Sequence, residues 1–308
     1  MKIAFINKYQ NKVERGAETF VCELSDRLSK NNEVKIFTSL DIREILKEKF
    51  DVVIPTNGRW QAFLARIVTW LYGGKVVISG QSGPGFDDRM NLYSFPDAFV
   101  ALTDYQKNWA RKINPYIRTV KIPNGVSFEN SESRPIDFGL PKPIILSVGA
   151  LEKNKRHDLT IKAVSKIANA SMVIIGKGSQ EKNLRKMCEN LIPGRFVITS
   201  FPHKDVSKVY KSASVFAFPT VPWESFGIVL LEAMKAGLPV VTNDDPIRRE
   251  IVGEAGFFVD PVDTEKYADT LKIALNENRK EKSLAQAKKF NWDIIAIQYE
   301  KLFKDLAK

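Results

Sequence analysis

Short apolar runs alternate along the first half of this chain with longer segments whose apolar residues recur at helical spacing. The runs are rich in β-branched residues and cover 2–7, 34–38, 51–54, 75–79 and 98–102. A helix is expected from about Ala17 to Ser29, after the first run. This alternation of strands and helices predicts a parallel sheet covered by helices on both faces.

The same pattern begins again after a polar, proline-containing stretch at 127–143, which we interpret as a linker. The second set of apolar runs covers 144–149, 172–176, 196–198, 215–219, 239–242 and 257–259. We therefore predict two Rossmann-like, doubly wound α/β domains, at 1–138 and 139–290, which face each other across a cleft. A terminal helix at 291–308 is expected to pack back toward the first domain.

The length of 308 residues agrees with two domains, and a hydrophobic content of 44% is ordinary for a globular protein. The formal net charge of +11 could indicate a nucleic-acid partner. Residues 1–140 carry 20 basic and 16 acidic side chains, however, and residues 141–308 carry 27 and 20. Because the excess is diffuse, the charge does not favour nucleic acid.

No secretory leader is readable at the start of the chain, and nowhere do 18 apolar residues follow one another. The two cysteines, Cys22 and Cys188, lie far apart inside helical patterns, which is typical of reduced thiols. We expect a cytoplasmic protein.

The segment 219–239 carries the strongest chemical signal. A buried strand ends at Pro219, a loop holds Glu224, and a helix begins near 226–227 and ends at Gly237. In open α/β sheets ligands bind beyond the carboxyl ends of the strands, and amides at a helix start favour an anion such as a diphosphate. Glu224 is placed to accept hydrogen bonds from sugar hydroxyls.

Glu232 lies about a turn and a half into that helix, among apolar neighbours that bury most of it. A carboxylate in such a helix needs a partner, because an unpaired buried charge is very costly. The alternative interpretation is a solvated helix carboxylate.

These residues together resemble the signature of glycosyltransferase family 4, a retaining family with the GT-B fold. The family has two glutamates separated by seven residues, matched by Glu224 and Glu232, followed by Gly-x-Pro-Val-Val, matched at 237–241. The resemblance implies that Glu224 contacts the hydroxyls of the donor sugar, with Ser225, Phe226 and Gly227 beside it. It implies that Glu232 binds the ribose hydroxyls of the nucleotide.

Other segments match the family in order over nearly the whole chain, and the first domain would then hold the acceptor and the second the donor. Gly16, after the first strand, resembles the glycine loop that approaches the diphosphate. The stretch 147–158 resembles the phosphate-binding segment, in which Lys155 would stabilise charge on the leaving diphosphate. Ala150 stands where the family usually has an arginine, and Arg156 is expected to substitute for it. A solvated loop is the alternative for Lys155 and Arg156.

Two further donor-side features are implied by the resemblance. Gly176 and Gly178 match the Gly-x-Gly turn at the cleft edge, and Phe201 lies in the loop expected to contact the base. His203, in the same loop, is interpreted as a surface residue.

On the acceptor side, many relatives have a histidine near the donor sugar, whereas this chain has no histidine before His157. Gln81 is the nearest polar substitute. It opens a glycine-rich loop that ends in Asp87 and Asp88, for which we expect acceptor or sugar contact. A flexible surface turn is the alternative, and the Pro-Asn-Gly turn at 123–125 is given no catalytic role.

The family's chemistry implies front-face transfer through an oxocarbenium-like state, in which the protein positions the reactants and stabilises charge. We expect no metal and no cofactor, with a nucleotide-diphosphate sugar as co-substrate and a glycan or lipid-linked acceptor. A sugar-nucleotide epimerase and a basic non-catalytic binding protein are the alternatives. A dinucleotide-dependent oxidoreductase is disfavoured because Glu181 stands where its third glycine would be.

The segment 59–72 predicts a helix with four aromatic residues, flanked by Arg59, Arg66 and Lys75. Interfacial helices combine aromatic and basic residues in this way, which suggests peripheral contact with the inner face of a membrane. The alternative is a core helix, since Phe63, Ile67 and Trp70 fall at helical spacing.

Overall fold

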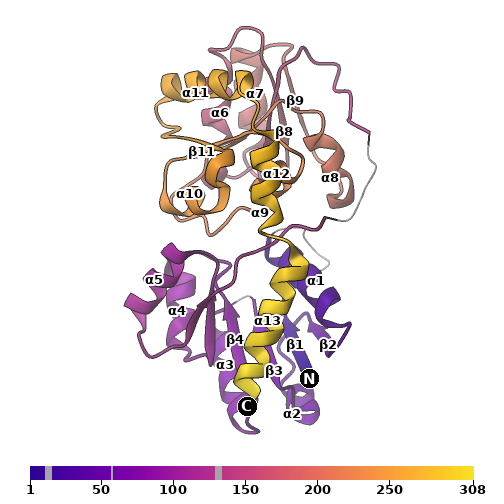
Figure 1. The fold of residues 1–308 in the computed structure, drawn as a ribbon, viewed down its shortest axis with the longest axis vertical. Helices are drawn as coiled ribbons and strands as arrows, with labels where there is room; N and C mark the ends of the chain where they lie inside the picture. The colour runs from indigo at the N-terminus through magenta and orange to yellow at the C-terminus, as the bar shows by residue number, and fades with distance from the viewer. Residues whose placement is uncertain (11–15, 57, 129–133) are drawn as a thin grey trace. The chain divides into compact units, whose positions relative to one another are not determined.

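The computed structural model describes residues 1–10, 16–56, 58–128 and 134–308, and it divides into two compact units (Figure 1). The N-terminal unit comprises Met1–Ser127, Trp223–Phe226 and Phe290–Lys308. The C-terminal unit comprises Phe128–Pro222 and Gly227–Lys289. Each unit contains one six-stranded parallel sheet, so the predicted fold of two doubly wound α/β domains is confirmed.

The sheet of the N-terminal unit has the strand order β2-β1-β3-β4-β5-β6. Its strands are β1 (Lys2–Ile6), β2 (Glu33–Phe37), β3 (Val52–Pro55), β4 (Lys75–Ser79), β5 (Ala98–Ala101) and β6 (Thr119–Lys121). Its helices are α1 (Gly16–Leu28), α2 (Ile42–Glu48), α3 (Trp60–Trp70), α4 (Phe86–Tyr93), α5 (Asp104–Ile113) and α13 (Trp292–Ala307). The inner strands β1, β3, β4 and β5 are apolar because both of their faces are buried, whereas the edge strand β2 is mostly exposed.

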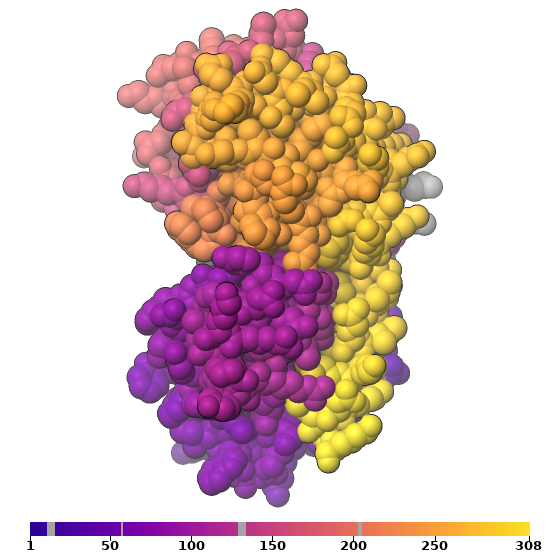
Figure 2. All heavy atoms as spheres, turned by 60° about the vertical axis from the view of Figure 1, so that its left-hand side comes forward, coloured from indigo at the N-terminus to yellow at the C-terminus, as the bar shows by residue number. Residues whose placement is uncertain are grey.

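Alternate residues of these strands enter two separate cores, one on each face of the sheet. On one face, Ile3 and Phe5 pack with α1 and with α13. On the other face, Ala4 and Ile6 pack with α2, α3, α4 and α5. The helix at the end of the chain is therefore part of the N-terminal core, and Figure 2 shows its yellow atoms lying along the atoms of the same unit.

Helix α13 is fixed by its cap and by aromatic contacts. The side chain of Asn291 accepts a hydrogen bond from the amide of Asp293, which satisfies an amide at the helix start. Tyr299 and Trp292 lie one above the other on the buried face, and their rings stand 5.7 and 6.2 Å from that of Phe20 in α1. The spacing of seven residues repeats after two helical turns, which keeps this face on the sheet.

The sheet of the C-terminal unit has the strand order β12-β11-β10-β7-β8-β9. Its strands are β7 (Ile144–Val148), β8 (Ser171–Ile175), β9 (Phe196–Thr199), β10 (Val215–Phe218), β11 (Val240–Asn243) and β12 (Gly256–Val259). Its helices are α6 (His157–Val164), α7 (Glu181–Leu191), α8 (His203–Tyr210), α9 (Ile228–Lys235), α10 (Pro246–Val252), α11 (Thr264–Asn276) and α12 (Lys280–Lys288), with short 3₁₀ turns η1 (Lys153–Lys155) and η2 (Gly253–Ala255).

Helix α3 does not bury the large apolar residues that the core interpretation of its sequence placed inside. The residues that bury it against the sheet are small, namely Ala62, Ala65, Val68 and Thr69. Phe63 and Ile67 are each 44% exposed, and Trp70 is 70% exposed. The core interpretation of those three residues is therefore wrong, because the small residues occupy the inward face and the large apolar ones face outward.

Candidate functional site

The predicted site residues of both units follow the carboxyl ends of parallel strands. In the N-terminal unit, Gly16 follows β1 and Gln81 follows β4. In the C-terminal unit, Lys155 follows β7, Gly176 follows β8 and Gly227 follows β10. Both sets therefore lie at the sheet edge where ligands of open α/β folds bind.

The loop between β10 and α9 is anchored before it reaches Glu224. The Thr220 amide donates to the Asn243 side-chain oxygen at 2.8 Å, and the Asn243 side-chain nitrogen donates to the Thr220 carbonyl at 2.9 Å. These two bonds join the chain just after β10 to the end of β11. The loop therefore leaves the sheet in a defined direction.

Gly227 turns this loop into α9. Its φ is +90°, in the left-handed region that favours glycine. A Cβ atom there would also lie 3.1 Å from the Phe218 ring. Any other residue at this position would be strained, so the glycine sets where the first amides of α9 lie.

The residues just before Gly227 belong to the N-terminal unit. Glu224 and Ser225 are half-buried, and Phe226 is buried with its ring 6.0 Å from that of Phe290. Gly83, in the glycine-rich loop, has a φ of +83°, and a Cβ atom there would lie 2.5 Å from the Trp223 carbonyl oxygen. The structure thus brings the glycine-rich loop against the segment that carries Glu224, a contact that the sequence did not predict.

Glu232 has the partner that a carboxylate in an apolar helix requires. The buried hydroxyl of Tyr210, at the end of α8, donates to its Oε2 atom at 2.8 Å. Burial, and then the charge of Glu232, raises the pKa of Tyr210 well above its usual value, so the hydroxyl stays protonated and acts as a donor. Tyr210 was not singled out in the sequence, because its partner lies 22 residues away in another helix.

Lys155 and Arg156 lie in the turn between β7 and α6, and both are half-buried. The Lys155 ammonium stands 5.9 Å from the centroid of the Phe218 ring, at the end of β10. Arg156 ends η1 in the left-handed conformation, with a φ of +50°. The structure thus places Lys155 and Gly227 against the same aromatic ring.

A buried histidine stabilises the same turn. His157 Nε2 lies 3.2 Å from the Ala150 carbonyl, which only accepts, so Nε2 carries the proton and Nδ1 accepts from the Ser147 hydroxyl at 2.9 Å. Burial, with a contribution from the charge of Lys155, lowers the pKa of His157 to about 4. No role was predicted for His157, and its two hydrogen bonds show that the neutral ring positions this turn.

Gly176 and Gly178 have a packing role. A Cβ atom on Gly176 would lie 1.9 Å from the Gly149 carbonyl oxygen, and one on Gly178 would lie 2.5 Å from the Leu151 carbonyl oxygen. The Leu151 amide donates to the Lys177 carbonyl at 2.9 Å. These glycines allow the loops after β7 and β8 to contact each other through their backbones.

Phe201 follows β9 and lies in the C-terminal unit. It is half-buried, and its ring stands 6.4 Å from that of Phe138 in a T-shaped arrangement. Its contact with the base of a nucleotide stays a prediction.

Gln81, Asp87 and Asp88 occupy three different surroundings in the N-terminal unit. Gln81 and Asn124 exchange two side-chain hydrogen bonds of 2.9 Å. Asp87 pairs with the exposed Arg59 at 2.6 Å. Asp88 is fully buried, and burial raises its pKa to about 8 even though side-chain and backbone N–H groups donate to it. Of these three side chains, that of Asp88 is the one that is fully buried.

Gly16 is exposed at the first residue of α1, and Arg15 lies outside the described residues. Two residues further on, Glu18 is only 7% exposed. Its Oε2 atom is buried and has no hydrogen-bond partner within the described part of the chain. Glu18 lies in the segment that resembles the family's glycine loop, and no role was predicted for it.

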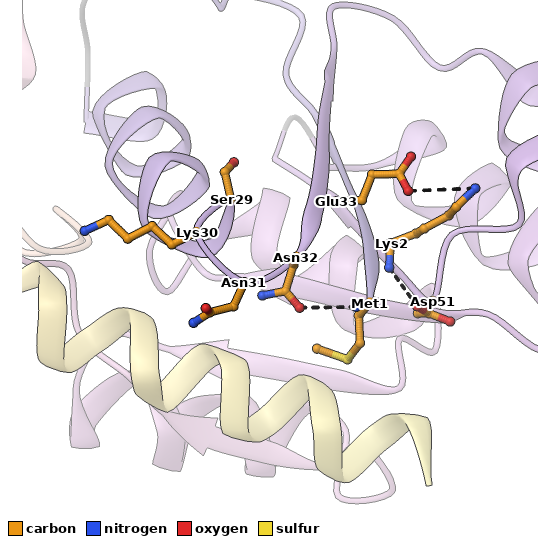
Figure 3. Close-up of a pocket in the computed structure, with 8 residues that line it drawn as sticks. All are labelled: Met1, Lys2, Ser29, Lys30, Asn31, Asn32, Glu33 and Asp51. Carbon is orange, nitrogen blue, oxygen red and sulfur yellow. Dashed lines mark hydrogen bonds and ion pairs between the residues drawn. The ribbon is translucent and has the colours of Figure 1, made fainter.

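Figure 3 shows a pocket of about 590 Å³ elsewhere in the N-terminal unit, lined by Met1, Lys2, Ser29, Lys30, Asn31, Asn32, Glu33 and Asp51. It lies where β1, β2 and β3 begin, which is the sheet edge opposite to the one that holds Gly16 and Gln81. Its polar groups bond to one another, as the Lys2 amide does to Asp51 at 2.7 Å. We do not assign the chemistry to this pocket.

Among the described residues no group of three or more His, Cys, Asp and Glu side chains could hold a metal ion. Within those same ranges, no helix is both long and apolar enough to cross a bilayer.

Two doubly wound parallel sheets, with glycine turns and a helix start beyond their strand ends, define the class of two-domain Rossmann-like proteins. The model of the family described as glycosyl transferases group 1 matches residues 129–290, which is more than half of the chain. The chain belongs to this family.

Sequence and structure comparisons agree with that assignment. The chain is 29% identical over 222 residues to a phosphatidyl-myo-inositol mannosyltransferase of Mycobacterium leprae, a match covering 68% of this chain and 59% of that protein. The chain thus spans about three-fifths of the length of this curated relative. HepE of Anabaena, solved with UDP-glucose, superposes with a TM-score of 0.81 at 16% identity over 99% of this chain and 100% of that one. A sucrose-phosphate synthase from Thermosynechococcus elongatus gives 0.80 at 17% over 99% of each chain. At these identities the superpositions establish the fold.

Proposed function

We propose that this protein transfers a sugar from a nucleotide-diphosphate sugar to an acceptor hydroxyl, with retention of the anomeric configuration. The observation that carries the proposal is the segment from Glu224 through Gly227 to Glu232. It combines a loop carboxylate, a helix start fixed by a glycine, and a second carboxylate held by Tyr210. Membership of the glycosyl transferase family supports the same reaction.

In this proposal the C-terminal unit binds the nucleotide. Glu232 accepts hydrogen bonds from the ribose hydroxyls through carboxylate lone pairs that the Tyr210 hydroxyl does not use. The first amides of α9, beyond Gly227, face the diphosphate, because a helix start carries partial positive charge. Phe201 contacts the base.

The leaving diphosphate is stabilised by positive charge. Lys155 is held beside Phe218, the ring that also packs on Gly227, so its ammonium lies near the helix start that receives the phosphates. Arg156 takes the place of the arginine that the family usually has at the position of Ala150. His157 stays neutral and adds no charge of its own. Such preorganised charge lowers the barrier without a metal ion.

Glu224 contacts the hydroxyls of the donor sugar, and a leaving diphosphate oxygen takes the acceptor proton. The bond from the anomeric carbon to the diphosphate breaks while the bond to the acceptor oxygen forms on the same face. Retention follows from this geometry. The two glutamates do not act as the acid and nucleophile of a glycosidase, because one of them binds ribose.

We propose further that the acceptor is a glycan or lipid-linked molecule, and that the protein contacts a membrane through α3. The outward face of this helix is apolar, with Trp60 77% and Trp70 70% exposed. The mycobacterial relative is by name a mannosyltransferase of a phospholipid, which supports an acceptor at a bilayer. Arg66 pairs with Asp97 at 2.8 Å, so aromatic insertion contributes more to this contact than that arginine does.

The proposal is tested first by screening UDP-, GDP- and ADP-sugars for thermal stabilisation of the protein. Release of the nucleoside diphosphate is then assayed with a panel of alkyl glycosides and lipid acceptors. A ligand at ~100 times its dissociation constant adds ~2.7 kcal/mol of stability. We expect one nucleotide to stabilise the protein and its sugar to be transferred with EDTA present. A protein that binds no nucleotide sugar, or requires manganese for turnover, would contradict the proposal.

A further inference from the structure

We infer that Asp88 is a positioning residue for the transfer reaction, which holds the glycine-rich loop after β4 against the Trp223–Phe226 segment and thereby places Glu224. This inference rests on the proposed function, in which Glu224 contacts the donor sugar. It assigns to Asp88 a role different from direct acceptor contact.

The Asp88 carboxyl is held inside the N-terminal unit. Asp88 lies in the first turn of α4 and is fully buried. Its Oδ2 atom accepts a hydrogen bond from the Gln106 side chain at 3.0 Å, and its Oδ1 atom accepts one from Asn91 at 3.3 Å. A buried carboxyl group is costly unless N–H groups satisfy it, so these contacts fix its position.

Asp88 and its partner Gln106 contact the glycine-rich loop at two points. The backbone amide of Gly83, in the middle of the loop, lies close enough to the Asp88 carboxyl to lower its pKa. Gln106, also fully buried, donates to the Gly80 carbonyl at 2.7 Å and accepts from the Leu102 amide at 2.7 Å. Asp88 and Gln106 therefore hold the loop from inside the N-terminal unit at Gly80 and at Gly83.

The glycine-rich loop in turn lies against the segment that carries Glu224. Gly83 is in the left-handed conformation, and its Cα hydrogen faces the segment that includes Glu224. A Cβ atom in that direction would lie 2.5 Å from the Trp223 carbonyl oxygen and 3.1 Å from Ser225 Cα. The backbones on either side of Glu224 thus rest on the residue that Asp88 holds.

A glycine-rich loop has many accessible backbone conformations, and selecting one of them costs conformational entropy. Transfer needs the carboxylate and the donor sugar in a narrow range of geometries. A buried hydrogen-bond acceptor that makes one loop conformation dominant therefore acts on catalysis through Glu224, without touching the substrate.

Two variants test the inference by different routes. Asp88→Asn replaces a carboxyl oxygen by an NH₂ group, which then faces the N–H donors of Asn91 or Gln106. Gly83→Ala disrupts the close approach of the loop to the Trp223 carbonyl without changing charge. Asp104→Asn is the matched control, because Asp104 also lies in the first turn of a helix of this unit but pairs with Lys121 on the surface.

We expect both test variants to lower kcat for transfer at least tenfold, while the dissociation constant for the nucleotide stays within twofold, since the predicted nucleotide ligands belong to the other unit. We also expect amide hydrogen exchange to rise at least tenfold in 80–86 and in 223–226 together. Asp104→Asn should change neither quantity. If Asp88→Asn does not fold, Gly83→Ala carries the test.

Faster exchange in 80–86 with no change in 223–226 would overturn the inference, as would transfer within twofold of the wild type in both variants. Loss of nucleotide affinity in parallel with transfer would show a general structural effect and would also overturn it. If the wild type transfers no sugar, the proposed function fails, whereas the exchange measurement still decides whether Asp88 couples the two segments.

Discussion

The carboxylate of Glu232, in the largely apolar helix α9, accepts a hydrogen bond of 2.8 Å from the hydroxyl of Tyr210. Hydrogen bonds to charged groups contribute ~1.5–3 kcal/mol, so Glu232→Ala should weaken nucleotide binding ~10- to 100-fold and lower transfer with it. Tyr210→Phe removes only the donor that orients the carboxylate, and we expect a smaller loss, about threefold to tenfold. Calorimetry with the nucleoside diphosphate measures both. Unchanged affinity in Glu232→Ala would contradict the ribose assignment.

His157 makes the stability of the protein depend on pH in a defined direction. The pKa of His157 is lowered from the usual value of 6.5 to about 4 in the folded protein. Between these two pH values the unfolded chain therefore binds more protons than the folded one. The contribution of His157 to the free energy of unfolding is therefore complete above about pH 6.5. It is lost as the pH falls toward 4, by up to ~1.4 kcal/mol per pH unit. In urea unfolding, the wild type should lose ~1–2 kcal/mol more than His157→Gln between pH 6.5 and pH 5. Parallel pH dependence in the two proteins would contradict the role given to His157.

Site residues that share a local motif could be predicted from the sequence, whereas those defined by a partner far along the chain could not. Glu224, Gly227 and Glu232 share one loop and helix, so their order predicts their chemistry. Tyr210 and Asp88 take their roles from side chains of other helices, Glu232 and Gln106, and no spacing in the sequence records those contacts.

At the scale of elements, α3 carries the most direct prediction outside the site. Burying a large apolar side chain contributes ~1.5 kcal/mol or more, so replacing both Trp60 and Trp70 by Ala should lower the partition coefficient onto anionic vesicles ~100-fold. The matched control replaces Ile294 and Ile297, exposed side chains of α13 on the opposite face of the same sheet, and should bind vesicles as the wild type does. Binding is measured by co-sedimentation with the vesicles at low salt, and recovery of all the wild-type protein in the supernatant would contradict membrane contact through α3.

Apolar runs predicted eleven of the twelve strands in the described part of the chain, and most of these strands are apolar because helices bury both faces of the sheet. The exception is β6 (Thr119–Lys121), a three-residue edge strand whose last residue is exposed, so its sequence contains no apolar run. Helix α3 was ambiguous for a different reason. Small residues can bury a helix face as well as large ones can, and the periodicity of Phe63, Ile67 and Trp70 does not say which face turns inward.

At the scale of the whole molecule, the chain crosses between its two units more often than a division at one linker suggests. Trp223–Phe226 and Phe290–Lys308 belong to the N-terminal unit although both lie in the second half of the sequence. Glu224 therefore belongs to the N-terminal unit, and Glu232, in α9, belongs to the C-terminal unit.

The central claim is that these residues transfer a sugar from a nucleotide with retention, and the most direct measurement is NMR of the product formed from an α-linked nucleotide sugar with EDTA present. The account predicts an α-linked product on the acceptor and one nucleoside diphosphate released for each sugar transferred. A β-linked product, or a changed sugar that remains attached to the nucleotide as an epimerase would leave it, would contradict the account.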